Sequence, residues 1–189
     1  MAKVLAFAGS AKRTSFNKKL VAVAAEGARQ AGVEVTLIDL ADYPMPLFDE
    51  DLEADQGMPE KAQAFKDLLI AHDGLLIASP EYNSAFSPLL KNALDWASRS
   101  SAENEPPLIA YKGKYAAIMA TSPGGLGGMR GLVFLRMLLG NIGITVLPEQ
   151  QAVGSAFKAF DESGALIDEK TQEKVMGLGQ ALALELMKE

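Results

Sequence analysis

Hydroxyl and cationic side chains crowd the loop that follows the first apolar segment of the chain. The loop begins at Gly9, where that segment ends, and leads into a stretch with helical periodicity. The residues of this loop that could form hydrogen bonds or ion pairs with a ligand are Ser10, Lys12, Arg13, Ser15 and Asn17. A helix N-terminus presents unpaired N–H groups and the positive end of the helix dipole, so a strand, this loop and a helix in succession suit a bound phosphate. An ordinary turn, with Ser15 as the helix cap and both cations solvated, is the alternative.

Two later loops have an unusual composition that fits the same kind of ligand. Pro80-Glu81-Tyr82-Asn83 combines a proline-stiffened turn, an aromatic face and an amide, which is what a wall for a planar heterocycle needs. Ser122-Pro123-Gly124-Gly125-Leu126-Gly127-Gly128 is rich in glycine, the residue that lets a backbone approach a ligand closely. A surface tyrosine and a merely flexible loop are the respective alternatives.

Other kinds of site are excluded by what the chain lacks. It contains no cysteine, which rules out disulfides, thiolate nucleophiles and cysteine-based metal sites. Its single histidine, His72, precedes a predicted strand, at the opposite end of the sheet from the three loops, so we predict a structural role for it. The acidic run 49–55 indicates a solvated loop rather than a metal site. With no nucleophile–base pair at the three loops, a bound cofactor is expected to carry the chemistry.

The first loop also lacks the glycine patterns that bind larger phosphate ligands. Gly9 is the only glycine near it, so neither a nucleoside-triphosphate loop nor a dinucleotide fingerprint is present. Asp39, at the end of the second predicted strand, could serve as a ribose-binding acid, but a surface role is the simpler interpretation.

Five apolar segments indicate strands, and five segments with helical periodicity alternate with them. The predicted strands are 3–8, 33–38, 74–78, 115–120 and 144–147, the last closed by Pro148; the predicted helices are 18–31, 59–71, 88–96, 129–140 and 168–187; residues 40–59 are predicted to form a loop. This alternation predicts an α/β doubly wound domain over residues 1–189, with a parallel sheet covered by helices on both faces. Because parallel strands end at one edge, the three loops are expected to meet there.

Composition narrows the partners and the compartment. The formal net charge of −6 argues against a nucleic-acid-binding protein. No stretch approaches the roughly 20 apolar residues of a membrane span, and the apolar start of the chain is too short for a signal peptide. We therefore expect a cytoplasmic protein.

Four motifs, in register from the first predicted strand to the fifth, resemble the NADPH-dependent FMN reductases, flavodoxin-like quinone, chromate and azo-dye reductases. The family's Gly-Ser-x-Arg-x-x-Ser-x-Asn motif corresponds to residues 9–17, with one departure: lysine stands at position 12 and Arg13 follows. The family's Pro-Glu-Tyr-Asn corresponds to residues 80–83, and its Leu-Lys-Asn-Ala-x-Asp-Trp to residues 90–96. The glycine loop with Arg130 matches the family's Ser-x-Gly-x-x-Gly-Gly-x-Arg.

The resemblance implies a flavodoxin-like sheet in the order 2-1-3-4-5 and non-covalent FMN as cofactor. It also implies that NADPH or NADH delivers a hydride to the flavin N5, and that a quinone, chromate, azo compound or free flavin then takes the electrons, with no catalytic side chain. The cofactor-binding residues it implies are Ser10, Lys12, Arg13, Ser15, Phe16, Asn17, Pro80, Glu81, Tyr82, Asn83, Ser122, Pro123, Gly124 and Gly125. Such proteins are usually homodimers or homotetramers, and the apolar helix 129–140 would suit an interface as well as core burial.

Two other functions share this scaffold. A flavodoxin would carry electrons without its own NAD(P)H reductase activity, although its phosphate loop is usually richer in threonine, serine and glycine. A non-catalytic binding domain of flavodoxin-like fold is the third possibility. Reduction of the bound flavin by NAD(P)H separates the three.

Overall fold

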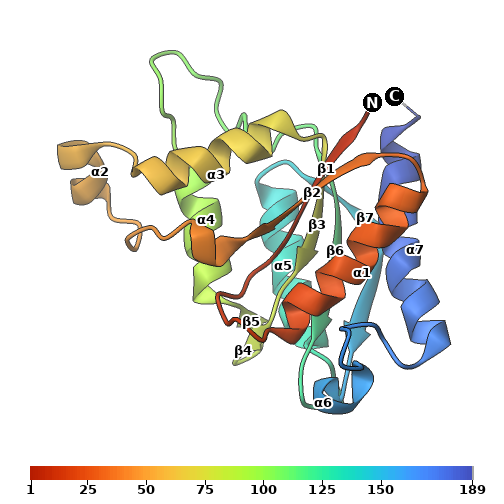
Figure 1. The fold of residues 1–189 in the computed structure, drawn as a ribbon. Coiled ribbons are helices and arrows are strands. Elements are labelled where there is room, and N and C mark those ends of the chain that lie inside the picture. Colours follow the sequence, from red (N-terminus) through yellow and green to blue (C-terminus); the bar gives the residue numbers. More distant parts are fainter. Residues whose placement is uncertain (189) are drawn as a thin grey trace.

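The computed structural model describes residues 1–188 and has a five-stranded, all-parallel sheet at its centre (Figure 1). The strands are β1 (Lys3–Ala8), β2 (Glu34–Asp39), β3 (Gly74–Ala78), β6 (Tyr115–Thr121) and β7 (Thr145–Val153). Their spatial order is β2-β1-β3-β6-β7. In terms of the five main strands this is 2-1-3-4-5, so the predicted doubly wound, flavodoxin-like α/β fold is confirmed.

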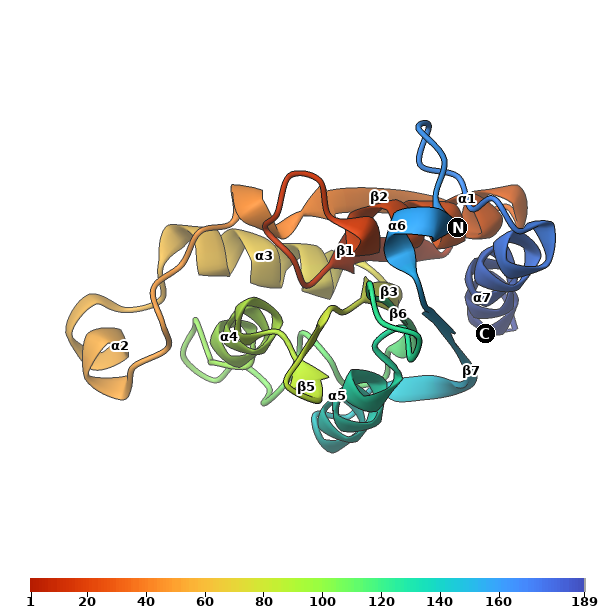
Figure 2. The ribbon, with the colours of Figure 1, turned by 90° about the horizontal axis from the view of Figure 1, so that it is seen from below.

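Helices cover both faces of the sheet, as Figure 2 shows. α1 (Phe16–Gln30) and α7 (Glu169–Leu186) pack on one face, and α3 (Glu60–Ala71), α4 (Pro88–Ala97) and α5 (Met129–Asn141) on the other. Successive residues of a strand point to opposite faces, which divides the core into two clusters. Along β1, Val4 and Ala6 belong to the first cluster, while Leu5 and Phe7 belong to the second. This is why β1 is a continuous apolar run rather than an alternating one.

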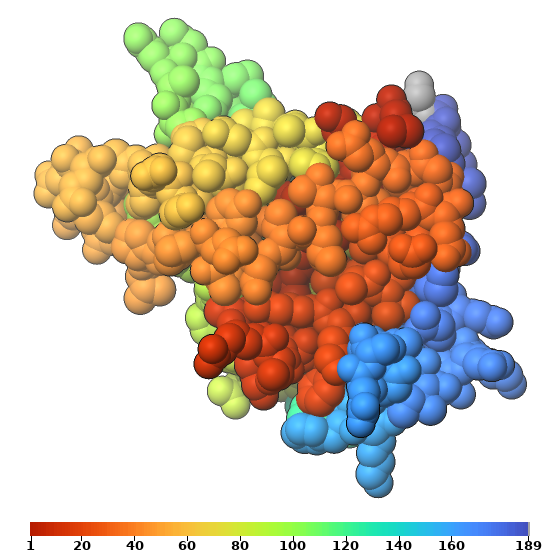
Figure 3. All heavy atoms as spheres, in the orientation of Figure 1, coloured from red at the N-terminus to blue at the C-terminus, as the bar shows by residue number. Residues whose placement is uncertain are grey.

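The segment between β2 and α3 is more ordered than its sequence predicts. Within the expected loop lie a short 3-10 helix at Leu40–Asp42 and the helix α2 (Glu50–Gln56). Asp49 caps α2 by accepting the N–H of Leu52, and Gly57 ends it at a φ of 73°. The loop prediction was wrong here because α2 buries no residue and so has no apolar periodicity. Figure 3 shows it projecting from the body of the molecule.

Two strand assignments also differ from expectation. β7 continues through Pro148 to Val153, because it is an edge strand whose pairing with β6 is irregular between Ala116 and Ile118, so a missing N–H is tolerated there. The second loop contains a small hairpin, β4 (Glu81–Tyr82) and β5 (Ala85–Phe86). Asn83 and Ser84 form its two-residue turn at positive φ.

The remaining differences are small. α1 begins at Phe16, two residues before the predicted start, and a short helix, α6 (Ala156–Ala159), follows β7. Within residues 1–188, no helix is both long enough and apolar enough to cross a bilayer.

Candidate functional site

The three loops meet at the edge of the sheet where β1, β3 and β6 end, the edge that Figure 2 faces. Ser87, the N-cap of α4, holds the first loop by donating its hydroxyl to the carbonyl of Gly9 at 2.6 Å. The Gly9 N–H in turn donates to the Ala78 carbonyl at 2.8 Å. A Cβ on Gly9 would lie 2.9 Å from the Leu90 Cβ, so close packing against α4 requires glycine there.

The first loop combines open hydrogen-bond donors with exposed cations. Ser15 stands at the N-cap of α1 but forms no side-chain capping bond, and within residues 1–188 the N–H groups of Phe16, Asn17 and Lys18 have no protein acceptor. Ser10 and Ser15 are buried, whereas Lys12 and Arg13 are exposed. Free N–H groups at a helix start beside two cations match the needs of a phosphate group.

Asn17 ties this loop to the start of the glycine loop. Its amide nitrogen donates to the Thr121 carbonyl at 3.0 Å, and its amide oxygen accepts the Thr121 N–H at 3.0 Å. The side chain is buried and both of its polar atoms are engaged. Asn17 therefore acts on the site chiefly by holding the two loops together. Sequence spacing gave no signal for this pair, because the residues are 104 positions apart.

Phe16, the first residue of α1, takes no part in these polar contacts and instead packs in an aromatic group. Its ring stacks on Phe160 and meets Phe157 edge-on, with centroids 5.7 and 5.3 Å apart. This contact fixes α6 beside the loop. The predicted contact of Phe16 with a cofactor remains a prediction.

The second loop presents Tyr82 to solvent and uses Glu81 internally. Tyr82 is 55% exposed, so one face of its ring is available to a flat ligand. Glu81 has only 8% of its side chain exposed, and its carboxylate contacts the start of α5. The Glu81 carboxylate is thus engaged within the protein, and Asn83 lies in the turn of the hairpin.

The glycine loop divides into an open half and a packed half. A Cβ on Gly125 would meet nothing within 4 Å, and one on Gly124 only the Ser122 hydroxyl at 3.9 Å. By contrast, a Cβ on Gly127, whose φ is +62°, would lie 2.6 Å from the Val153 carbonyl carbon. Within the described part of the chain the N–H groups of Gly124 and Gly125 have no acceptor. The glycines therefore serve two purposes, open donors in one half and close backbone packing in the other.

Other features that the sequence singled out make structural contacts. The His72 ring is buried between the Leu68 carbonyl and the Thr36 hydroxyl, at 2.6 and 2.8 Å, so its structural role is confirmed. Asp39 pairs with Lys18 at 2.5 Å and caps the 3-10 helix, as expected of a surface acid. Trp96, in the α4 motif, donates to the Pro46 carbonyl and holds the segment before α2.

Comparison with known proteins agrees with the fold and the loops. Residues 2–158 match the family of NADPH-dependent FMN reductases. An NAD(P)H-dependent FMN reductase of Pseudomonas aeruginosa is 37% identical over 183 residues, covering 96% of this chain and 94% of that protein. An NADPH:quinone oxidoreductase of Arabidopsis thaliana is 36% identical over 178 residues, covering 92% of this chain and 86% of that protein. FerB of Paracoccus denitrificans is a flavoenzyme NAD(P)H:(acceptor) oxidoreductase. Its structure superposes on this one with a TM-score of 0.81 at 31% identity, covering 100% of this chain and 98% of that chain.

The fold is that of a flavodoxin-like protein, and the loop cluster is its candidate ligand site. The chain belongs to the NADPH-dependent FMN reductase family. It is an FMN-dependent NAD(P)H oxidoreductase. FMN has one phosphate and one flat ring system, and the residues fit it: the start of α1 offers donors and cations, while Tyr82 and the open glycines offer an aromatic face and N–H groups.

Proposed function

We propose that FMN binds along the edge formed by the three loops. Its phosphate would be held by residues 10–17 and its ring by residues 80–83 and 122–125. The observation that carries this proposal is the pair of open donor sets, the N–H groups at the start of α1 and those of Gly124 and Gly125, in two loops that Asn17 ties together. Bound FMN supplies the redox chemistry, taking a hydride from NAD(P)H and passing the electrons to an acceptor.

The chain itself binds and orients in this scheme. Lys12 and Arg13 neutralise the phosphate, and charge-assisted hydrogen bonds of this kind contribute about 1.5–3 kcal/mol each. Arg13 is exposed and free to fold over the phosphate, so it can supply the planar donor pair that lysine at position 12 lacks. No side chain is required as a general acid or base.

A combined variant tests the phosphate position. Ser15→Ala with Arg13→Ala removes a hydroxyl and a cation from the first loop, and we expect FMN affinity to fall at least about a hundredfold if both contact the phosphate. Titration of the apoprotein with FMN, followed by flavin fluorescence, measures this. Arg29→Ala is the matched control, because Arg29 is an exposed cation at the other end of the same helix. Unchanged affinity in the double variant would place the phosphate elsewhere.

We further propose a quinone as the preferred electron acceptor. One relative is named an NADPH:quinone oxidoreductase, and the exposed, uncharged Tyr82 side chain borders the proposed position of the flavin ring, on which a flat quinone can stack. Steady-state assays with NADPH and NADH would compare a benzoquinone with chromate, an azo dye and free FMN. We expect the quinone to have the highest kcat/KM of these acceptors. We also expect its kcat/KM to fall in Tyr82→Ala. A higher value for any other acceptor would overturn it.

We propose that the protein is a homo-oligomer that pairs through α5. Val133 and Met137 are 61% and 66% exposed on this helix, beside a groove of about 530 Å³ between α4, β5 and α5. A second copy of the same helix would cover this apolar face. Light scattering after size-exclusion chromatography should show an oligomer that Met137→Glu dissociates. Met187→Glu, at an exposed methionine just after α7, should leave the mass unchanged.

We also propose that residues 1–189 act as a single domain in the cytoplasm. The two core clusters share one sheet, which supports unfolding as one unit. A single unfolding transition, coincident by fluorescence and circular dichroism, is the expected result.

A further inference from the structure

Glu81 makes an unusual set of contacts for an acid placed in a cofactor-binding loop. Its Oε2 accepts the backbone N–H groups of Arg130 and Gly131 at 3.1 and 3.3 Å. Its Oε1 accepts two donors of the Arg130 guanidinium, Nε at 2.8 Å and an Nη at 2.6 Å. The Glu81 side chain is 8% exposed, whereas the Arg130 side chain is 60% exposed. The acid is therefore the enclosed partner, and it is aimed at α5 rather than at solvent.

These contacts supply the cap that α5 lacks in its own sequence. The N-cap residue is Gly128, at a φ of 89°, which has no side chain to accept the first free N–H groups. A carboxylate from 49 and 50 positions earlier in the chain takes that role. Negative charge at a helix N-terminus interacts favourably with the helix dipole, so Glu81 acts as an internal anion for α5.

The same contacts close the glycine loop at its far end. Asn17 holds the start of this loop at Thr121, and Glu81 holds the residues that follow Gly128. The backbones approach closely here, since a Cβ on Gly131 would lie 3.2 Å from the Ala85 carbonyl oxygen. The open N–H groups of Gly124 and Gly125 thus stand between two fixed ends.

We propose that Glu81 is a positioning residue for the flavin site: by filling the N-terminus of α5 it sets the glycine loop in place and leaves the start of α1 as the open helix terminus for a phosphate. This inference rests on the proposed function of the three loops. It predicts that the carboxylate acts through its charge and its acceptor atoms rather than through contact with the flavin, so a small carboxylate in solution can replace it.

The test is FMN titration of the apoprotein in E81A, E81Q and the control E53A. Glu53 also pairs with an arginine, Arg99, but on the projecting α2. We expect E81A to bind FMN about tenfold more weakly and E81Q a few-fold more weakly, because the amide keeps one acceptor and loses the charge. Sodium acetate should restore most of the E81A affinity, compared with sodium chloride at equal ionic strength. Acetate should leave the FMN affinity of E53A and of the wild-type protein unchanged. If E81A lost affinity only because its structure were damaged, acetate would not restore it.

Hydrogen exchange of the apoprotein provides a readout that does not depend on FMN. Amides in residues 124–131 should exchange faster in E81A and be slowed again by acetate, with residues 10–17 unaffected. Wild-type affinity in E81A, or a loss that acetate does not reverse, overturns the proposal. Should E81A fail to fold, unchanged affinity and exchange in E81Q overturn it. A wild-type protein that binds no FMN refutes the proposed function instead, and the exchange measurement then still decides the role of Glu81.

Discussion

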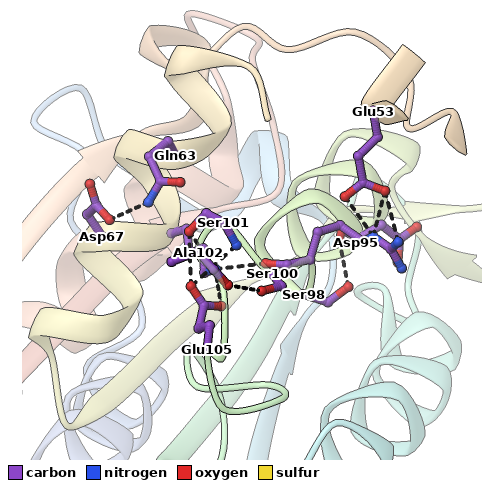
Figure 4. Close-up of polar contacts among 11 residues, drawn as sticks. Glu53, Gln63, Asp67, Asp95, Ser98, Ser100, Ser101, Ala102 and Glu105 are labelled. Carbon is purple, nitrogen blue, oxygen red and sulfur yellow. Dashed lines mark hydrogen bonds and ion pairs between the residues drawn. The ribbon is translucent and has the colours of Figure 1, made fainter. Parts of the chain in front are cut away.

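Two polar networks in this protein are built from similar residues and serve different ends. At the ligand edge, Asn17, Ser87 and Glu81 each bind the backbone of a distant segment and tie the three loops together. On the other side of the molecule, Lys66 of α3 lies almost wholly enclosed against the segment after α4. Its ammonium donates to the Arg99 carbonyl, the Ser101 hydroxyl and the Glu105 carboxylate; Figure 4 labels Ser101 and Glu105. The first network leaves N–H groups open around it. The second uses all three donors of its cation on itself.

The difference teaches how to interpret buried charge. Lys66 has 1% of its side chain exposed, and its contact lowers the pKa of the Glu105 carboxyl. Burial raises the pKa of Tyr111, which lies in the same half of the core. Perturbed pKa values often mark functional sites, yet here they belong to hydrogen-bonded structural groups. Glu105 is part of the Lys66 network, and the Tyr111 hydroxyl donates to the Leu94 carbonyl. Open donors at the start of α1 and in the glycine loop are the better indicator of a ligand.

The largest expected effect comes from removing the enclosed cation. Lys66→Met leaves Glu105 without its cationic partner and removes a donor from the Arg99 carbonyl, so we expect the free energy of unfolding to fall by about 4 kcal/mol. Urea denaturation of the apoprotein measures this. FMN affinity of the folded variant should stay within about twofold of wild type. A large loss of affinity at unchanged stability would show that the two networks are coupled.

Two glycines separate packing from binding within the ligand edge itself. Gly127→Ala places a Cβ against the Val153 backbone at positive φ, and we expect it to cost about 3 kcal/mol of stability. Gly125→Ala meets open space, so stability should change by less than about 1 kcal/mol while FMN binds more weakly. Thermal unfolding without FMN, together with FMN titration, distinguishes the two. Equal behaviour of the two variants would contradict the division of the loop.

Asn17→Ala should affect stability and binding together. The substitution removes both hydrogen bonds to Thr121 and leaves a buried N–H and C=O unpaired, at a cost of about 2 kcal/mol. FMN affinity should also fall, because the first loop is no longer tied to the glycine loop. Ser98→Ala, which removes a local bond to the Asp95 carbonyl, is a control outside the ligand edge. Loss of stability without loss of FMN affinity would show that Asn17 does not contribute to the binding site.

A smaller effect depends on pH. Lys66 and Ser101 lower the pKa of Glu105 below its ordinary value of 4.5 in the folded protein. Its contribution to stability is therefore present above the unfolded pKa and is lost as the pH falls through the folded pKa. The stability difference between wild type and Glu105→Gln should be constant above about pH 5.5 and shrink below about pH 4.5. A stability difference that grows on acidification would instead mean that the pKa of Glu105 is raised in the folded protein.

The smallest effect is expected at the partly exposed pair between Glu53, labelled in Figure 4, and Arg99. Glu53→Gln should change stability by less than about 1 kcal/mol and leave FMN affinity unchanged, because solvent screens such pairs. Denaturant unfolding at low and high salt checks this. A larger effect would mean that α2 is more firmly attached than its contacts indicate.

Residues whose roles are local could be predicted well. Ser87-Pro88 marks the start of α4, and Ser87 caps it by accepting the Leu90 N–H as its position indicates. The acidic helix α2 was missed because the prediction relied on apolar periodicity, although Asp49 and Gly57 carried the capping signals. The cofactor-binding roles of the individual loop residues remain predictions.

The sequence alone determined which segments become strands and helices, because apolar periodicity and capping residues act over a few positions. It also determined that three unusual loops share one edge, since right-handed crossovers make all five strands parallel. Only the tertiary structure decided which loop residues remain open. Asn17 and Glu81 find their partners 104 and about 50 positions away, and no local pattern encodes contacts over such separations.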